Sequence, residues 1–153
     1  MTSSSTPAAK AELLIHASAQ RAFDAFVEPD QLAQFWLARS SGPLAPGATV
    51  DWEFMVPGAH ETVVVKAFDR PRHLGFDWSD GVHVDLRFKD QAPNAVVVTV
   101  AASGFADADT AIGATEGFTL VLCDLKIWLE SGRSPGLVRD KAALLAQQLG
   151  QGK

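Results

Sequence analysis

The alternation of apolar and polar residues between positions 50 and 102, interrupted by short turns, constrains the fold of this chain more than any other feature. Successive side chains of a strand point to opposite faces of a sheet, so a two-residue period predicts strands with one buried face. Turns such as Pro57-Gly58 are too short to connect parallel strands, so the sequence predicts an antiparallel meander. The period is clearest at residues 82–89, where Val82, Val84, Leu86 and Phe88 alternate with His83, Asp85, Arg87 and Lys89.

The hydrophobic period changes to that of a helix at residues 115–129. Two shorter helices are expected at residues 19–27 and 31–37, and a last amphipathic helix at residues 137–149. Ser18 is a suitable N-cap for the first of them. Strands are expected at residues 12–16, 50–56, 62–68, 73–78, 82–89 and 95–102.

This order of segments predicts one α+β domain with a helix-grip fold. A curved antiparallel sheet of about six strands would wrap around the long C-terminal helix, with two short helices after the first strand. The chain has 153 residues, enough to bury one core without disulfides. We expect residues 1–10 to be a flexible tail, residues 11–132 to form the domain, and residues 133–153 to be an appended C-terminal helix.

The charge and cysteine content argue against several classes of protein. The formal net charge is −5 and the basic residues are scattered singly, so no stripe for binding nucleic acid is visible. A single cysteine allows neither an internal disulfide nor a site built from several cysteines. We find no apolar segment long enough for a membrane span and no secretory signal pattern, so a cytoplasmic location is expected.

Several motifs together resemble those of the START-like (Bet v 1-like, SRPBCC) superfamily. Within it, the chain is similar to bacterial proteins that resemble the C-terminal domain of the activator of Hsp90 ATPase. The resemblance covers residues 12–132, nearly the whole chain. Its motifs are Ile15-His16-Ala17-Ser18-Ala19 before Ala22-Phe23-Asp24-Ala25-Phe26, the pair Phe35-Trp36, the turn Pro46-Gly47, Glu116-Gly117-Phe118, and the closing run Leu129-Glu130-Ser131-Gly132.

The resemblance implies a helix-grip fold with an apolar cavity between the sheet and the long helix. The sequence is rich in aromatic residues that would line such a cavity, and we therefore expect it to bind a small lipophilic molecule. The residues expected to line the cavity are Phe35, Trp36, Trp52, Phe54, Phe76, Trp78, Phe88, Gly117, Phe118, Val121, Leu122 and Leu125.

Two alternatives to simple ligand binding stay open. An enzyme of the cyclase or dehydratase type would need an acid or base in the cavity, and Glu116 and Asp124 are the candidates. A co-chaperone-like or stress-related interaction protein is the other alternative, with the C-terminal helix as a possible homodimer contact. We expect no cofactor and no metal site, because the four histidines follow no metal-binding spacing, and we find no catalytic set of residues.

Overall fold

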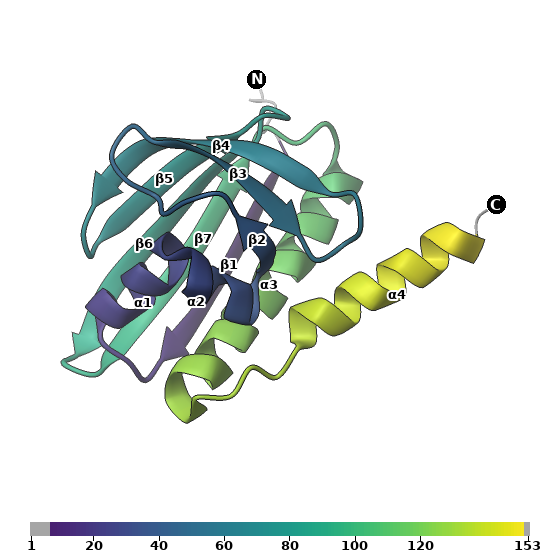
Figure 1. Ribbon diagram of the computed structural model, residues 1–153. Helices are drawn as coiled ribbons and strands as arrows, with labels where there is room; N and C mark the ends of the chain where they lie inside the picture. Colours follow the sequence, from purple (N-terminus) through teal and green to yellow (C-terminus); the bar gives the residue numbers. More distant parts are fainter. Residues whose placement is uncertain (1–6, 152–153) are drawn as a thin grey trace, which may run out of the picture.

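The computed structural model describes residues 7–151, and its seven strands form one curved antiparallel sheet (Figure 1). The order of strands across the sheet is β1-β7-β6-β5-β4-β3-β2. From β3 to β7 each strand therefore pairs with the next one along the chain, as the short turns predicted. The strands are β1 (Ala8–Ile15), β2 (Leu37–Ser40), β3 (Thr49–Phe54), β4 (His60–Asp69), β5 (His73–Trp78), β6 (His83–Ala92) and β7 (Ala95–Ser103).

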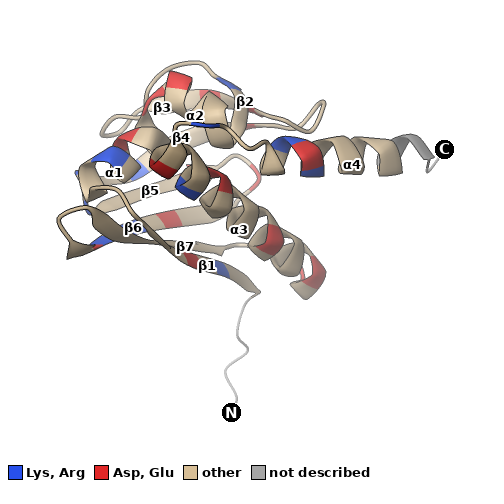
Figure 2. Ribbon diagram, turned by 90° about the horizontal axis from the view of Figure 1, so that it is seen from below, with Lys and Arg blue, Asp and Glu red and all other residues tan. Residues whose placement is uncertain are grey.

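Four helices accompany the sheet: α1 (Ala19–Val27), α2 (Pro29–Phe35), α3 (Ala108–Ser131) and α4 (Leu137–Gln151). The long helix α3 packs mainly against β1, while α1 and α2 lie between α3 and the rest of the inner face (Figures 1 and 2). The expected N-cap is present, because the Ser18 hydroxyl accepts a hydrogen bond from the Arg21 N–H. At the other end of the domain, Gly132 ends α3 in a left-handed conformation. The expected helix-grip arrangement is therefore confirmed.

The sheet has seven strands rather than the expected six or so, because the prediction did not include the edge strand β2. We expected residues 31–37 to be helical, but α2 ends at Phe35 and Leu37 begins β2. This strand has four residues, a register shift against β3 between Leu37 and Arg39, and only Leu37 buried. So short and irregular an edge strand carries no two-residue period that the sequence could reveal.

Two elements begin several residues earlier than expected. Strand β1 begins at Ala8, so residues 8–10 of the expected tail belong to the sheet, and residues 1–6 lie outside the described part of the chain. Its inward residues Ala9 and Ala11 are too small to give a clear apolar signal. Helix α3 begins at Ala108 rather than near residue 115, because the Asp107 carboxylate caps it by accepting from the Thr110 N–H at 2.8 Å.

The core lies between the inner face of the sheet and the helices. As expected, Phe118, Leu122, Leu125 and Leu129 of α3 are buried in it. From the sheet, the inward residues of β5 and β6 include Leu74, Phe76, Val84 and Leu86, all fully buried. Burial of this apolar surface is the main term that stabilises the fold.

Helix α4 is fixed to α3 through one buried carboxylate. Asp124 of α3 is 1% exposed, and its two oxygens accept hydrogen bonds from the backbone N–H groups of Leu137 (2.9 Å) and Val138 (2.8 Å). The first N–H groups of a helix have no internal partner, so Asp124 caps α4 from a neighbouring helix. Burial raises the pKa of Asp124 although the two backbone donors oppose this. Beyond this anchor α4 extends away from the body (Figure 2).

Histidine and aspartate side chains form a chain of hydrogen bonds on the outer face of β5 and β6. The His73 ring pairs with one oxygen of Asp85 (2.6 Å), the other oxygen of Asp85 pairs with the His83 ring (2.8 Å), and the second nitrogen of His83 pairs with Asp77 (2.5 Å). Gly75 leaves room for this chain, since a Cβ there would lie 2.8 Å from the Asp85 Oδ1 atom. The chain links two strands through their side chains.

We expected the series His83, Asp85, Arg87 and Lys89 to face water, and it does lie on the outer face of the sheet. Arg87 and Lys89 are exposed as expected. His83 and Asp85 are only half-exposed, because their hydrogen bonds hold them against β5. The outer face is therefore solvated at one end of β6 and hydrogen-bonded at the other.

Removing the Asp124 carboxylate should loosen α4. In Asp124→Ala two partly buried backbone N–H groups lose their acceptor, and we expect the docking of α4 to weaken by about 2 kcal/mol. Hydrogen exchange of the α4 amides measures this directly. Asp140→Asn, an exposed substitution in the first turn of α4, is the matched control and should leave exchange nearly unchanged. Equal protection of α4 in Asp124→Ala and wild type would contradict the anchoring role.

The pKa of His83 lies above its ordinary value of 6.5. The largest cause is the hydrogen bond between its ring and Asp77, and the hydrogen bond to Asp85 raises the pKa further, while burial opposes both. Such a histidine stabilises the fold below about pH 6.5, and this contribution is lost as the pH rises through the folded-state pKa. We expect Asp77→Asn to lower the His83 pKa in an NMR titration of the ring protons. Asp90→Asn, at the far end of β6, should not change it, and an unshifted His83 in Asp77→Asn would disprove the coupling.

Candidate functional site

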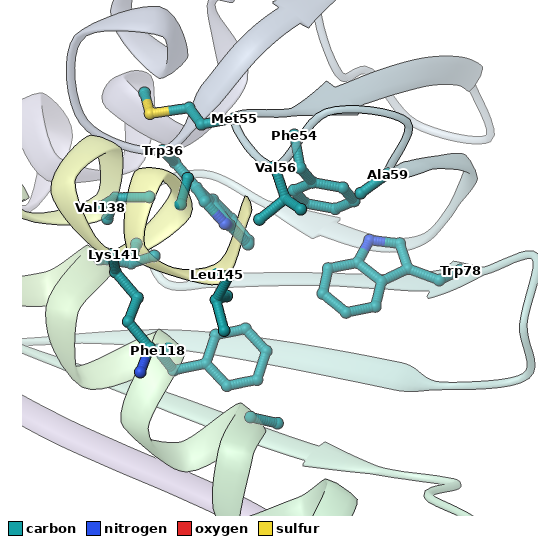
Figure 3. Close-up of a pocket in the computed structure, with 14 residues that line it drawn as sticks. Trp36, Phe54, Met55, Val56, Ala59, Trp78, Phe118, Val138, Lys141 and Leu145 are labelled. Atoms are coloured by element: carbon teal, nitrogen blue, oxygen red, sulfur yellow. The ribbon is translucent and has the colours of Figure 1, made fainter. Parts of the chain in front are cut away.

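An apolar pocket of about 270 Å³ opens where the turn after β3, the first half of α3 and the start of α4 meet (Figure 3). Trp36, after the end of α2, and Trp78, at the end of β5, complete its wall. Its lining residues are Trp36, Phe54, Met55, Val56, Ala59, Trp78, Ala114, Gly117, Phe118, Val121, Val138, Lys141, Ala142 and Leu145. Such a lining favours an apolar ligand over a polar one.

Three aromatic rings form the rigid part of the pocket wall. The rings of Trp78 and Phe118 stack with centroids 6.1 Å apart and planes at 20°. Trp36 lies 6.3 Å from Trp78 and 6.2 Å from Phe118, so each ring contacts both others. Because packed aromatic side chains have few conformations available, this wall is largely formed before any ligand arrives.

Two buried tryptophan N–H groups near the pocket have no hydrogen-bond partner in the described structure. They are the Nε1 groups of Trp52, which is fully buried in the core, and of Trp78, which lines the pocket. A buried donor without an acceptor costs about 1–3 kcal/mol, so such groups are uncommon. One of these unpaired donors thus belongs to a residue of the pocket wall, although its Nε1 atom is itself buried.

Lys141 of α4 is the one ionisable residue that lines the pocket in the described part of the chain. Its Nζ lies 2.9 Å from Oε1 of Glu116 on α3, and the two side chains are 30% and 59% exposed. In Figure 3, Lys141 and Trp78 stand on opposite sides of the pocket, with Trp36 and Leu145 between them. A cation paired with Glu116 thus stands at one edge of an otherwise apolar pocket.

The structure places half of the expected cavity residues on the pocket wall: Trp36, Phe54, Trp78, Gly117, Phe118 and Val121. The other half belongs to the closed core and does not line the pocket: Phe35, Trp52, Phe76, Phe88, Leu122 and Leu125. The reason is visible at Phe88, whose ring packs 5.3 Å from Phe23 and 5.9 Å from Phe26 of α1. The side chains of α1 and α2 fill that part of the space between sheet and long helix.

Glu116 and Asp124, the two polar groups expected in the cavity, are not among the residues that line this pocket. Asp124 is buried, but both of its oxygens are occupied in capping α4. Glu116 is more than half exposed and turns to Lys141 at the pocket's edge. Asp124 was a candidate because of its helical spacing among apolar neighbours, and Glu116 because of its place at the rim of the helix. Neither pattern indicates which partner the side chain finds.

Sequence reasoning missed the contributions of the β3–β4 turn and of α4. We expected Met55 and Val56 to continue the strand, but β3 ends at Phe54 and both face the pocket from the turn. We treated α4 as an appendage, yet Val138, Lys141 and Leu145 line the pocket. The amphipathic pattern of residues 137–149 was a usable signal, since an apolar helix face needs a surface to cover.

Within residues 7–151, no group of three or more potential ligand side chains is arranged to hold a metal ion. None of the described helices is long and apolar enough to cross a membrane.

Comparison with known proteins identifies the family. The family model described as "Activator of Hsp90 ATPase homolog 1-like protein" matches residues 16–130. No curated protein matches the chain. Among solved structures, the protein SSP2350 from Staphylococcus saprophyticus is similar with a TM-score of 0.74 and 22% identity, over 83% of this chain and 94% of that one.

Two further structures share the fold at similar identity. The Aha1 dimer from Colwellia psychrerythraea has a TM-score of 0.73 and 19% identity, over 82% of this chain and 97% of that one. The AHSA1-like protein from Aeromonas hydrophila has a TM-score of 0.65 and 20% identity, over 84% and 94% of the two chains. With three quarters of its length matched by the family model, this chain belongs to the activator of Hsp90 ATPase homolog 1-like family.

Proposed function

We propose that this protein binds a small lipophilic molecule in the pocket between the β3–β4 turn, α3 and α4. The observation that carries the proposal is the lining itself, in which thirteen of the fourteen residues are apolar or aromatic and the remaining one is Lys141. A ligand that covers these side chains removes apolar surface from water, which favours binding by roughly 25 cal/mol per Å² before the costs of association.

The size of the pocket limits the ligand. Its volume of about 270 Å³ is nearly twice that of a cavity of about 150 Å³ that holds benzene. It lies just below the range of about 300–1,000 Å³ typical of sites for drug-sized ligands. We therefore propose a compact ligand, with two fused rings or a short chain, rather than a long-chain lipid.

The enzymatic alternative finds less support at this site. Acid or base catalysis requires a titratable group within hydrogen-bond reach of the substrate. Glu116 does not line the pocket and forms an ion pair with Lys141. Both oxygens of Asp124 accept hydrogen bonds from the first backbone N–H groups of α4. We therefore favour binding over cyclase or dehydratase chemistry as the proposed activity.

Self-association is a second candidate function, and one observation favours it. The exposed large apolar side chains on the helices that flank the pocket include Ile112 of α3 (66%) and Leu144 of α4 (47%). One family structure with the same fold is described as an Aha1 dimer. We propose that a second copy of this chain covers these side chains, which would bury apolar surface that the monomer leaves in water.

Filling the pocket should abolish binding without harming the fold. A Cβ at Gly117 would meet nothing within 4 Å, so Gly117→Leu can project into the pocket and should weaken binding of N-phenyl-1-naphthylamine by about tenfold or more. Fluorescence enhancement of this uncharged probe is the measurement.

Gly113→Leu is the matched control for that experiment. Gly113 lies one helical turn earlier in α3, is exposed, also has nothing within 4 Å of a Cβ, and does not line the pocket. Both substitutions remove a helix glycine, which favours the helix by up to about 1 kcal/mol, so this effect cancels in the comparison. Equal loss of binding in both variants, or in neither, would contradict the assignment of the site.

The proposed self-association predicts that Leu144→Asp shifts the protein toward monomer. A carboxylate placed in an apolar contact would lose its hydration, so we expect the dimer to dissociate at least tenfold more readily. Sedimentation velocity over a range of protein concentrations is the measurement. Gln147→Asp, an exposed polar position on the same helix, is the control, and a wild-type chain that stays monomeric at all concentrations would rule the proposal out.

A further inference from the structure

The side-chain hydrogen-bonding groups that line the pocket are donors only. The lining residues carry the indole N–H groups of Trp36 and Trp78, of which the second is buried, and the ammonium group of Lys141, and none of them carries a side-chain oxygen. Building on the proposed lipophile site, we infer that its ligand is a compact apolar carboxylic acid, bound as the carboxylate with its charge at Lys141. A ligand with acceptors and a negative charge complements such a lining, whereas a donor-rich or cationic ligand does not.

The ammonium group of Lys141 is available to a ligand because its ion pair with Glu116 is weak. The Glu116 side chain is 59% exposed, so it would regain full hydration on leaving Lys141. Ion pairs this exposed contribute between about 0 and 1 kcal/mol, which a ligand carboxylate can replace. The Lys141 side chain is 30% exposed, and an apolar ligand body beside it would exclude more water and strengthen the new pair.

The geometry orients the ligand. Lys141 stands on one side of the pocket and the stacked pair Trp78 and Phe118 extends to the other (Figure 3). With its carboxylate at Lys141, the apolar body of the ligand would lie against Trp36 and Leu145 and reach the rings beyond them.

A cationic lipophile is the main competing ligand, because aromatic walls also attract ammonium groups. Lys141 opposes it, since its own positive charge lies in the same pocket and like charges repel. The cation comes from α4, which lies beyond the residues 16–130 matched by the family model. The preference for an acid would therefore be a property that α4 adds to the family's domain.

The test compares three ligands that share one apolar body: 2-naphthoate, uncharged 2-methylnaphthalene and 2-naphthylmethylammonium. Each displaces N-phenyl-1-naphthylamine from the full-length protein at pH 7 and low salt. We expect 2-naphthoate to bind about tenfold more tightly than the ammonium compound, because one charge is attracted and the other repelled. This preference should shrink in 0.5 M NaCl, which screens a pair at the pocket's edge.

Three variants separate the charge from the apolar pocket. Lys141→Met keeps an unbranched apolar side chain and should bring the ratio of the two affinities close to one while 2-methylnaphthalene still binds. Glu116→Gln frees Lys141 and should tighten 2-naphthoate binding by about twofold to fivefold. Lys89→Met removes a charge from the exposed outer face of β6 and should change neither affinity.

The outcomes distinguish this inference from the proposal it rests on. If none of the three ligands binds, the proposed lipophile site is wrong and the inference falls with it. If 2-methylnaphthalene binds but wild type shows no preference for the acid, or Lys141→Met retains the preference, only the inference is overturned. A preference that Lys141→Met removes and Lys89→Met keeps supports both.

Discussion

The structure depends on the way one helix covers a strongly curved sheet. Helix α3 packs mainly on β1, so a single helix leaves much of the concave face uncovered. Near α1, Phe23 and Phe26 close the remaining space against Phe88. At the opposite end, no side chain of the described structure fills the space in the way that Phe23 and Phe26 do near α1. There Trp36, Trp78 and Phe118 form the wall of an open pocket. The pocket is the part of the concave face that the helices do not fill.

A second contact sets the chemistry of the pocket, namely the capping of α4 by Asp124. A buried carboxylate is stable only when its oxygens find donors, and the first N–H groups of α4 supply them. Once the start of α4 is fixed, its next turns place Val138, Lys141 and Leu145 beside the aromatic wall. A single hydrogen-bonded anchor thus adds both apolar surface and the only lining charge in the described structure.

Much of the fold could be predicted from the sequence, because long segments carry a strong period. Strand β6 and helix α3 show this, since their inward residues recur every second residue in one and at helical spacing in the other. Strand β2 could not be predicted, because only Leu37 of its four residues is buried and its pairing with β3 is irregular. The alternation of apolar and polar residues cannot reveal a strand that forms mainly by hydrogen bonding to its neighbour in the sheet.

The pocket was harder to predict than the fold for a physical reason. Periodicity indicates which side chains face inward. It does not indicate which of these are packed in the closed core and which line a pocket. Phe76 and Trp78 lie on the same strand and face, yet Phe76 is fully buried in the core while Trp78 lines the pocket. The role of Lys141 depends on the direction in which α4 leaves Asp124, and this is a tertiary contact.

The pocket formed by Trp36, Trp78 and Phe118 is the proposed site of the lipophile. Intermolecular nuclear Overhauser effects between a bound naphthalene compound and assigned protein protons are the direct test of this proposal. We expect cross-peaks to the Trp78 indole N–H, the Phe118 ring and the Leu145 methyl groups, which all surround the pocket. Cross-peaks confined to exposed side chains such as Ile112, with none to the aromatic wall, would contradict the account.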